Sequence, residues 1–117
     1  MMLLGSATSV NLVLGVTDMR KSINGLSLVV ADHLERDVFS GHLFVFCNQS
    51  KTIIKILYWD RNGFCLWQKR LERHRFYWPT SEQDVLEMEP RQLHWLLDGL
   101  DLKQIFGHPE LNFSNLS

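Results

Sequence analysis

Apolar residues in the first third of the chain recur with a helical period. They stand at positions 19, 23, 26, 30 and 34, which is the stripe of an amphipathic helix of about four to five turns. Thr17 is its predicted N-cap, so the helix is expected to begin at Asp18 and to end near Asp37. Residues 10–15 come before it and are typical of a short strand that ends at a glycine.

The period changes from helical to extended after Gly41. Three segments rich in Phe, Val, Ile and Trp are predicted strands, at 42–47, 53–59 and 64–69. The sequence NQSKT makes a turn between the first two. The sequence DRNG at 60–63 predicts a tight hairpin, because Asn and Gly tolerate the positive φ that such turns require. Residues 75–78, which Pro79 follows, are a candidate fourth strand.

Cross-strand partners share a face, so the predicted hairpin has two defined faces. One face carries Lys55, Leu57, Trp59, Phe64, Leu66 and Gln68. The other face carries Ile54, Ile56, Tyr58, Cys65, Trp67 and Lys69. The second is the better core face, because only its last residue is charged. The first face is either a stacking platform with two large rings or a surface that a helix covers, with only the lysine tip in water.

The last third of the chain is predicted to hold one short strand and one short helix. Residues 85–88 are the candidate strand. Pro90 suits the first helical position, leucines at 93, 96, 97 and 100 supply the apolar stripe, and Gly99 ends the helix. Glu89 stands at the N-cap, where Ser or Thr would be a better acceptor. The tail at 103–117 has no pattern beyond a Gly-His-Pro turn at 107–109.

These elements predict an α+β fold in a single domain over residues 1–117. It is expected to be an antiparallel β-meander of three to five strands, with a long N-terminal-side helix and a shorter C-terminal helix. Alternating β-α-β units are not evident, so a parallel sheet is not expected.

Basic and aromatic residues gather in one stretch, although the net charge of the chain is −1. From Lys51 to Pro79, seven Lys or Arg face two acids, a net charge of +5, and residues 80–117 hold two basic against seven acidic residues, a net charge of −5. Three of the four tryptophans and both tyrosines lie within 55–79. Cations interleaved with rings are typical of surfaces that bind nucleic acid or an acidic partner. The candidate binding residues are Arg20, Lys21, Lys55, Trp59, Arg61, Lys69, Arg70, Arg73 and Arg75.

Two groups of these cations have alternative interpretations. Arg20 and Lys21 oppose the positive end of the predicted helix dipole, which favours an anion site with the backbone N–H groups there. The alternative is a pair of solvated side chains with Asp18 as local partner. Arg70, next to Glu72, belongs either to a binding loop at 69–75 or to a structural ion pair.

Sequence signatures of catalysis and of cofactor binding are absent. There is no GxSxG, no HExxH and no glycine-rich phosphate loop, and the five histidines are scattered. Cys47 and Cys65 are isolated and are expected to be core thiols of a reducing compartment. A site of three carboxylates that hold two metals is the enzymatic alternative, which the small size of the chain disfavours. We therefore expect no catalytic residue, no metal site and no cofactor.

The N-terminus has no basic n-region and no apolar run of membrane length. This pattern predicts a cytoplasmic protein without a signal peptide or a membrane span.

Four stretches together resemble a known family. They are VTDMRKSINGL at 16–26, FSGHLFVFCN at 39–48, KILYWDRNGFCLWQKRLERHRFYWP at 55–79 and LHWLLDGLDL at 93–102. In this order, over roughly positions 10–102, they are similar to TnpB, the accessory protein encoded by the second open reading frame of insertion-sequence family sixty-six. It is distinct from the RNA-guided nuclease of the same name. The matching motif residues are Thr17, Asp18, Met19, Arg20, Lys21, Gly25, Trp59, Asp60, Gly63, Phe64, Lys69, Arg70, Leu71, Glu72, Arg75, Phe76, Trp78 and Pro79.

The resemblance implies a bacterial protein needed for transposition, encoded beside a first accessory protein and a large transposase that performs the strand chemistry. It brings no catalytic residue. The family pattern has a small residue where His74 stands and Thr where Glu89 stands. We expect a non-enzymatic accessory protein that binds DNA at the element ends, the transposase, or both. The alternative is a protein-interaction subunit without DNA contact. Neither a membrane nor a small-molecule substrate is expected.

Overall fold

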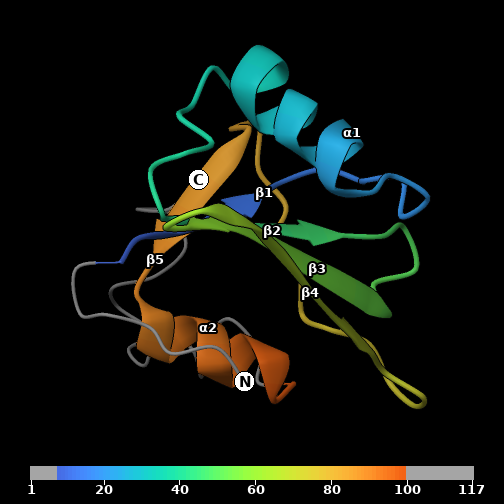
Figure 1. Ribbon diagram of the computed structural model, residues 1–117. Coiled ribbons are helices and arrows are strands. Elements are labelled where there is room, and N and C mark those ends of the chain that lie inside the picture. Colours follow the sequence, from blue (N-terminus) through green and yellow to red (C-terminus); the bar gives the residue numbers. More distant parts are fainter. Residues whose placement is uncertain (1–7, 100–117) are drawn as a thin grey trace.

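A mixed five-stranded sheet forms the centre of the fold, which a computed structural model describes for residues 8–99. The strands run in the order β4-β3-β2-β1-β5 across the sheet. Their bounds are β1 (Val10–Val13), β2 (Leu43–Cys47), β3 (Ile53–Asp60), β4 (Gly63–Arg70) and β5 (Val85–Met88). One face is covered by α1 (Ile23–Leu28) and the π-helical turn η1 (Val29–His33), and the other face is covered by α2 (Pro90–Leu97), as Figure 1 shows.

The predicted antiparallel meander is correct only for β2, β3 and β4. Strand β1 runs parallel to β2, with Val10 paired to Leu43, and α1 with η1 makes the crossover between them. Strand β5 then pairs antiparallel to β1 rather than to β4. The physical reason is that every residue of β1 is buried, so this short strand lies inside the sheet with a neighbour on each side. The expectation of a sheet without parallel pairing was wrong.

The predicted strand at 85–88 is confirmed, and the candidate strand at 75–78 is not. Residues 75–78 run as irregular chain past the end of the sheet. Phe76 and Trp78 are nevertheless buried, so their alternation reflects packing against the core rather than strand pairing. Short apolar alternation of this kind does not by itself distinguish a strand from a packed loop.

The long helix predicted over residues 18–37 was wrong at its beginning. Thr17 is buried and its N–H donates to the carbonyl of Cys47 at 3.0 Å, which holds it beside β2. The Asp18 carboxylate then accepts the N–H of Arg20 at 2.9 Å, a local turn that competes with helix formation. The helical residues begin only after Ser22, the N-cap.

The same helix also ends earlier than predicted. The chain leaves it at Leu34, and Glu35 has a φ of 52°, in the left-handed region. The N–H of Arg36 donates back to the carbonyl of Val30 at 3.0 Å, which satisfies a free carbonyl of the last turn. The helical segment is therefore short, because both ends are closed by local hydrogen bonds.

The predicted helix near the C-terminal side is confirmed as α2. Pro90 takes its first position, and the Gln92 side chain accepts the N–H of Glu89, the N-cap, at 2.8 Å. This bond is half of a capping box, and it uses the backbone N–H of Glu89, which any residue except proline would supply there. Gly99, with a φ of +87°, ends the helix as expected. The turn expected at 107–109 lies outside the described residues.

The predicted faces of the hairpin are confirmed, because Leu57 pairs with Leu66 and Ile56 with Trp67. The turn itself differs: Arg61, not Asn62 or Gly63, has the positive φ, at 51°. The helix-covered alternative is correct in part. Phe64 and Leu66 pack against the cluster that includes Leu26 and Val30, whereas Trp59 is half-buried and packs against Phe39.

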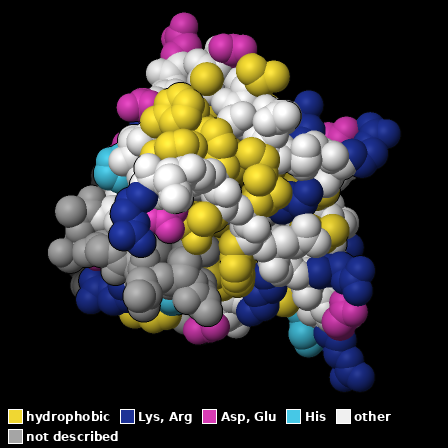
Figure 2. Space-filling model, viewed as in Figure 1, with side chains coloured by type: hydrophobic (Ala, Val, Ile, Leu, Met, Phe, Trp, Pro, Cys, Tyr) yellow, Lys and Arg dark blue, Asp and Glu magenta, His cyan; other side chains and the backbone are white. Residues whose placement is uncertain are grey.

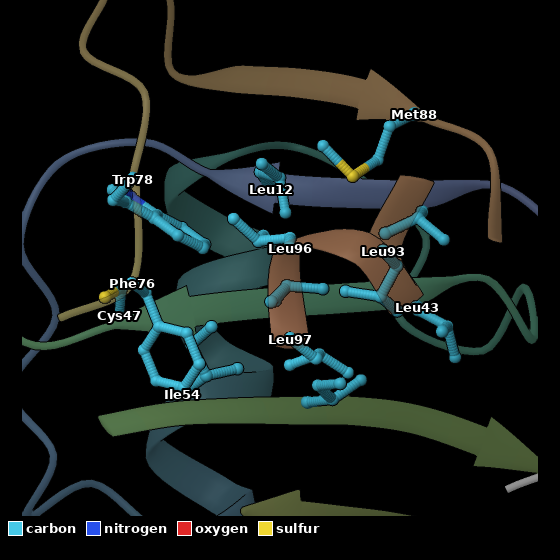
Figure 3. Packing of buried hydrophobic residues seen from close by; sticks show 13 residues of the cluster. Leu12, Leu43, Cys47, Ile54, Phe76, Trp78, Met88, Leu93, Leu96 and Leu97 are labelled. Carbon is cyan, nitrogen blue, oxygen red and sulfur yellow. The ribbon is translucent and has the colours of Figure 1, made fainter. Parts of the chain in front are cut away.

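Two apolar clusters lie on opposite faces of the sheet. Figure 3 shows Leu93, Leu96 and Leu97 pointing from α2 onto the strands, with Phe76 and Trp78 completing the cluster. On the other face, Leu26 and Val30 pack against a second cluster from the strands, formed by Val13, Phe44, Phe46 and Leu57. Within residues 8–99 no helix is long and apolar enough to cross a membrane.

The two cysteines differ in environment, which predicts different thiol reactivity. Burial raises the pKa of the Cys47 thiol to about 11 from its ordinary 9.0, whereas Cys65 is only half-buried. A thiol reagent at pH 8 should therefore modify Cys65 first and Cys47 only on unfolding. Because the folded thiol ionises later than the unfolded one, its stabilising effect is complete below pH 9 and decreases above it. Cys47→Ala should lose that alkaline decrease, and equal labelling rates at the two thiols would contradict the assignment.

Candidate nucleic-acid interface

The segment after β4 is a short loop attached to the sheet at both ends. The N–H of Leu71 donates to the carbonyl of Thr52, and the N–H of Phe76 donates to the carbonyl of Lys51, each at 2.8 Å. Phe76 is only 1% exposed, so its ring anchors the far end in the core. The residues between these anchors, 72–75, are all exposed. We call residues 72–75 the basic loop.

An open groove of about 720 Å³ lies between the basic loop and the end of α2. Its lining includes Lys51, Arg73 and Arg75, and Asp98 lies on the α2 side. Tyr77 also lines it and is 54% exposed. The buried Trp78 Nε1 has no hydrogen-bond partner in the described part of the chain. The groove thus combines cations with an accessible aromatic ring.

The arginines near the groove differ in whether they are already paired. Arg70 forms two hydrogen bonds to the Glu72 carboxylate, each at 3.1 Å, which raises the pKa of its guanidinium. This is the ion pair that the structural alternative anticipated. Among residues 8–99, Arg73 and Arg75 have no carboxylate within ion-pair distance. These two side chains, rather than Arg70, are the available cations of the loop.

Two of the predicted binding lysines are engaged within the fold. The ammonium of Lys55 donates to the carbonyls of Met19 and Lys21, at 2.7 and 3.0 Å, and so joins β3 to the segment that leads into α1. The ammonium of Lys69 donates to the carbonyl of Leu97 at 2.8 Å, at the end of α2. A cation at a helix C-terminus is favourable because the carbonyls there are partly negative. Both lysines therefore stabilise the fold in this structure.

Arg20 and Lys21 lie before α1 and not in its first turn, so the geometry expected for a helix anion site is absent. Arg20 instead forms a 2.7 Å ion pair with Asp18. The hydrogen bonds from Arg20 hold the pKa of the Asp18 carboxyl well below its usual range. The alternative with Asp18 as local partner is the arrangement that the structure has.

Arg61 and Trp59 lie at the hairpin end, away from the basic loop. Arg61 is highly exposed at the turn and 3.7 Å from the Asp60 carboxylate. Trp59 is half-buried and packs edge-to-face against Phe39 and Phe64, with ring centroids 5.1 and 5.0 Å apart. Phe39 is 58% exposed, so part of this aromatic cluster faces solvent.

Lys and Arg side chains gather on one side of the molecule, at the right of Figure 2, from the entry of α1 to the basic loop. The nine predicted binding residues are therefore divided among three places, which are the entry of α1, the hairpin turn and the basic loop. Lys51 and Tyr77 belong to the groove but were missed as candidates. The only feature of the sequence that could have indicated these two residues is that they belong to the basic, aromatic stretch.

Comparison with known proteins supports the resemblance seen in the motifs. The family described as IS66 Orf2 like protein matches residues 8–106. The chain belongs to this family. Two relatives come from Sinorhizobium fredii (strain NBRC 101917 / NGR234). Protein y4hO is 38% identical over 91% of this chain and 89% of its own length, and protein y4jC is 33% identical over 79% of each. No solved structure matches.

Membership of the IS66 Orf2-like family is consistent with an accessory role in transposition. The backbone at His74 bears on the expectation of a small residue there. His74 has a φ of 66°, in the left-handed region that glycine adopts most easily. Glycine is therefore physically favoured at this position of the basic loop.

Removing the Lys55 ammonium should destabilise the protein. Lys55→Met keeps the apolar stem but leaves two carbonyls without their donor, and we expect a loss of about 1–2 kcal/mol in the free energy of unfolding. Urea denaturation measures it. Lys21→Met is the matched control, because that side chain is exposed and its loss should cost under about 0.5 kcal/mol. Equal effects of the two variants would show that the Lys55 contacts contribute nothing.

Replacing His74 by glycine should stabilise the basic loop. His74→Gly removes the left-handed strain but adds unfolded-state entropy, so we expect a net gain of about 0.5 kcal/mol. His74→Ala is the control, since it removes the imidazole but keeps a Cβ and should give no gain. Thermal unfolding compares them, and a gain in both variants would mean that the imidazole, not the backbone, is unfavourable.

Proposed function

We propose that this protein is a non-enzymatic accessory factor in the transposition of a bacterial insertion sequence, and that its groove binds the phosphates of DNA at the element ends. The observation that carries the proposal is the basic loop, in which Arg73 and Arg75 are exposed on a segment attached to the sheet at both ends. The family supports the accessory role.

The attachment of the loop matters for affinity. Binding orders flexible side chains and loops at a free-energy cost, which is smaller when the backbone is already held in place. The two hydrogen bonds at its base and the buried Phe76 ring provide this. An arginine offers a planar pair of donors that matches two phosphate oxygens, and Lys51 adds a point charge on the same groove.

The exposed ring of Tyr77 extends what the groove can bind. Aromatic side chains stack on bases without reading their sequence, while cations follow the phosphates. The groove therefore supports binding that depends on backbone and on stacking, with little sequence preference. Asp98 on the α2 side disfavours phosphate there, which restricts the path of the strand to the loop side.

The uneven distribution of charge along the chain would orient the protein on DNA. The stretch 51–79 carries +5 and residues 80–117 carry −5. The positive stretch would attract DNA, and the acidic residues that follow it in sequence would be repelled by the phosphates. The remaining predicted cations, Arg20, Lys21 and Arg61, do not line the groove and would add only long-range attraction.

The second candidate is a subunit that binds the transposase or the first accessory protein without touching DNA. The observation in its favour is the solvent-facing cluster of Phe39, Trp59 and Phe64. Binding of purified transposase in the absence of DNA, lost in Phe39→Ala but retained without the loop arginines, would support this function. Cytoplasmic residence is expected in either case.

The DNA proposal is tested by the double variant Arg73→Ala/Arg75→Ala. Titration of labelled element-end DNA at several salt concentrations measures both affinity and its salt dependence. Each neutralised phosphate releases counterions, so losing two contacts should reduce the slope of log K against log salt by roughly 2 and weaken binding at low salt. Transposition frequency should fall with it.

The matched control is Arg20→Ala/Arg61→Ala, which removes the same charge from exposed arginines that do not line the groove. If the control weakens DNA binding as much as the loop variant does, binding is non-localised attraction. If neither variant changes binding or transposition, the groove is not the DNA site. The unfolding midpoint of both variants should stay unchanged, because solvated arginines contribute little to stability.

A further inference from the structure

Within residues 8–99, strand β4 is an open edge of the sheet and is twice as long as the other edge strand. It has eight residues and pairs only with β3 among the described strands, whereas β5 at the opposite edge has four. Unpaired N–H and C=O groups along an edge strand form a template for another strand. We infer that the outer edge of β4 is a docking site for an extended segment of a partner protein, with acidic residues at the amino-terminal end of that segment.

The backbone groups that face outward can be identified from one hydrogen bond. The N–H of Leu71 donates inward to the carbonyl of Thr52, in the same register as the β3–β4 ladder. The backbone N–H and C=O groups of successive residues point to opposite sides of a strand. Those of the odd-numbered residues of β4 therefore point toward β3, and those of the even-numbered residues point outward. The outward residues are Phe64, Leu66, Gln68 and Arg70.

The features that normally protect an edge strand are concentrated on β5 and are weak on β4. Strand β5 is short, carries Glu87 in its middle and is followed by Glu89 and Pro90. Strand β4 contains no proline, and its charged residues, Lys69 and Arg70, stand only at its end. Proteins use short strands, charges and prolines to prevent edge pairing, so β4 is the edge at which pairing is permitted.

The surroundings of β4 suit a strand with apolar side chains. Phe64 and Leu66 on the α1 face, and Cys65 and Trp67 on the α2 face, are all half-buried. Figure 2 shows hydrophobic side chains in a continuous band from the loop beside α1 across the edge where β4 lies in Figure 1. A strand added here would bury both sets of side chains, on both faces of the sheet, and so gain hydrophobic stabilisation.

The charges around β4 indicate which end of the partner segment carries the acidic residues. The carboxyl-terminal end of β4 holds Arg70 and continues into the basic loop with Arg73 and Arg75, while the hairpin end balances Arg61 against Asp60. An antiparallel partner, the more stable pairing per residue, brings its amino-terminal end to the basic side. Acidic residues there would be attracted to the arginines.

A second copy of this chain is a poorer occupant. Two β4 strands that form one continuous antiparallel sheet must pair residues on the same face. Arg61 stands in the turn before β4 and Arg73 in the basic loop after it, so pairing centred on Trp67 brings Arg61 of one copy toward Arg73 of the other just beyond the strand ends. The register two residues away brings Asp60 opposite Glu72 instead. Like charges opposite one another are destabilising, so both central registers are disfavoured.

Hydrogen exchange of single amides provides the test, with a synthetic peptide as the probe. The peptide has glutamates at its amino-terminal end followed by alternating valine and threonine. In the free protein, the amides of Phe64, Leu66 and Gln68 should exchange fast, and those of Cys65 and Trp67 slowly. Added peptide should slow exchange at the even-numbered amides only. A peptide with lysines in place of the glutamates should bind at least about ten-fold more weakly.

One substitution separates edge pairing from other binding modes. Gln68→Pro removes an outward N–H from an exposed residue and leaves the ladder to β3 intact. It should weaken peptide binding by at least about ten-fold, whereas Gln68→Thr, which keeps the N–H and suits a strand, should change it less than about two-fold. Slow exchange at Cys65 and Trp67 in the proline variant shows that the strand still folds.

Three outcomes would overturn the inference. They are slow exchange at the even-numbered amides in the free protein together with a dimeric mass in solution, peptide binding that the proline variant retains, and equal binding of the lysine peptide. The inference does not depend on the proposed DNA contact, because no nucleic acid is present. Arg73→Ala/Arg75→Ala, by contrast, should keep the even-numbered protection pattern with the peptide even where it loses DNA binding.

Discussion

The fold depends on the burial of its central strands on both faces. Every residue of β1 and β2 is buried, including Asn11, whose amide donates to the carbonyl of Leu43 at 3.1 Å. A sheet that is apolar on both sides must be covered twice, and a chain of 117 residues can do this only with short helices. Helix α1 covers one face and α2 the other, and the crossover that places α1 also makes β1 parallel to β2.

Double covering moves charged residues to the ends and edges of the sheet. Lys55 and Lys69 bind carbonyls at the entry of α1 and at the end of α2, so each lysine ties one covering helix to the β3–β4 hairpin. Their positive charge is used within the fold. Arg73 and Arg75, which have no carboxylate within ion-pair distance among residues 8–99, lie just past the end of β4. The position of the basic loop thus follows from the two backbone hydrogen bonds that attach the chain to the end of the sheet after β4.

The two surfaces assigned here share that end. The groove lies beside the basic loop, and the β4 edge ends at Arg70, only a few residues before it. A DNA strand in the groove and an acidic-ended segment on the edge would therefore feel the same arginines. Their charges would favour either ligand at first contact and would make the two binding events sensitive to one another through screening. Such an arrangement suits a protein that joins DNA to a protein partner.

Local chemistry decided much of what could be read from the chain alone. The faces of the hairpin follow from the alternation around DRNG, the beginning and end of α2 from Pro90 and Gly99, and the family from four motifs in order. These depend on neighbours in sequence. The site was predicted less well, because a cationic residue type does not reveal its partner. Only the tertiary structure showed that Lys55 and Lys69 bind carbonyls distant in sequence while Arg73 stays exposed.

The tertiary structure likewise decided the length of the first helix and the direction of β1. The apolar stripe at helical spacing predicted a helix that begins at Asp18. The backbone N–H of Thr17 instead bonds the carbonyl of Cys47, and the helix begins only after Ser22. Strand direction depends on which buried surfaces meet across the core, and this information is not local. The chain by itself determined its local turns, periodicities and charge segregation, because these act between near neighbours. The packing of distant segments determined the parallel pair, the open β4 edge and the accessible arginines, because burial and hydrogen bonding compete over the whole molecule.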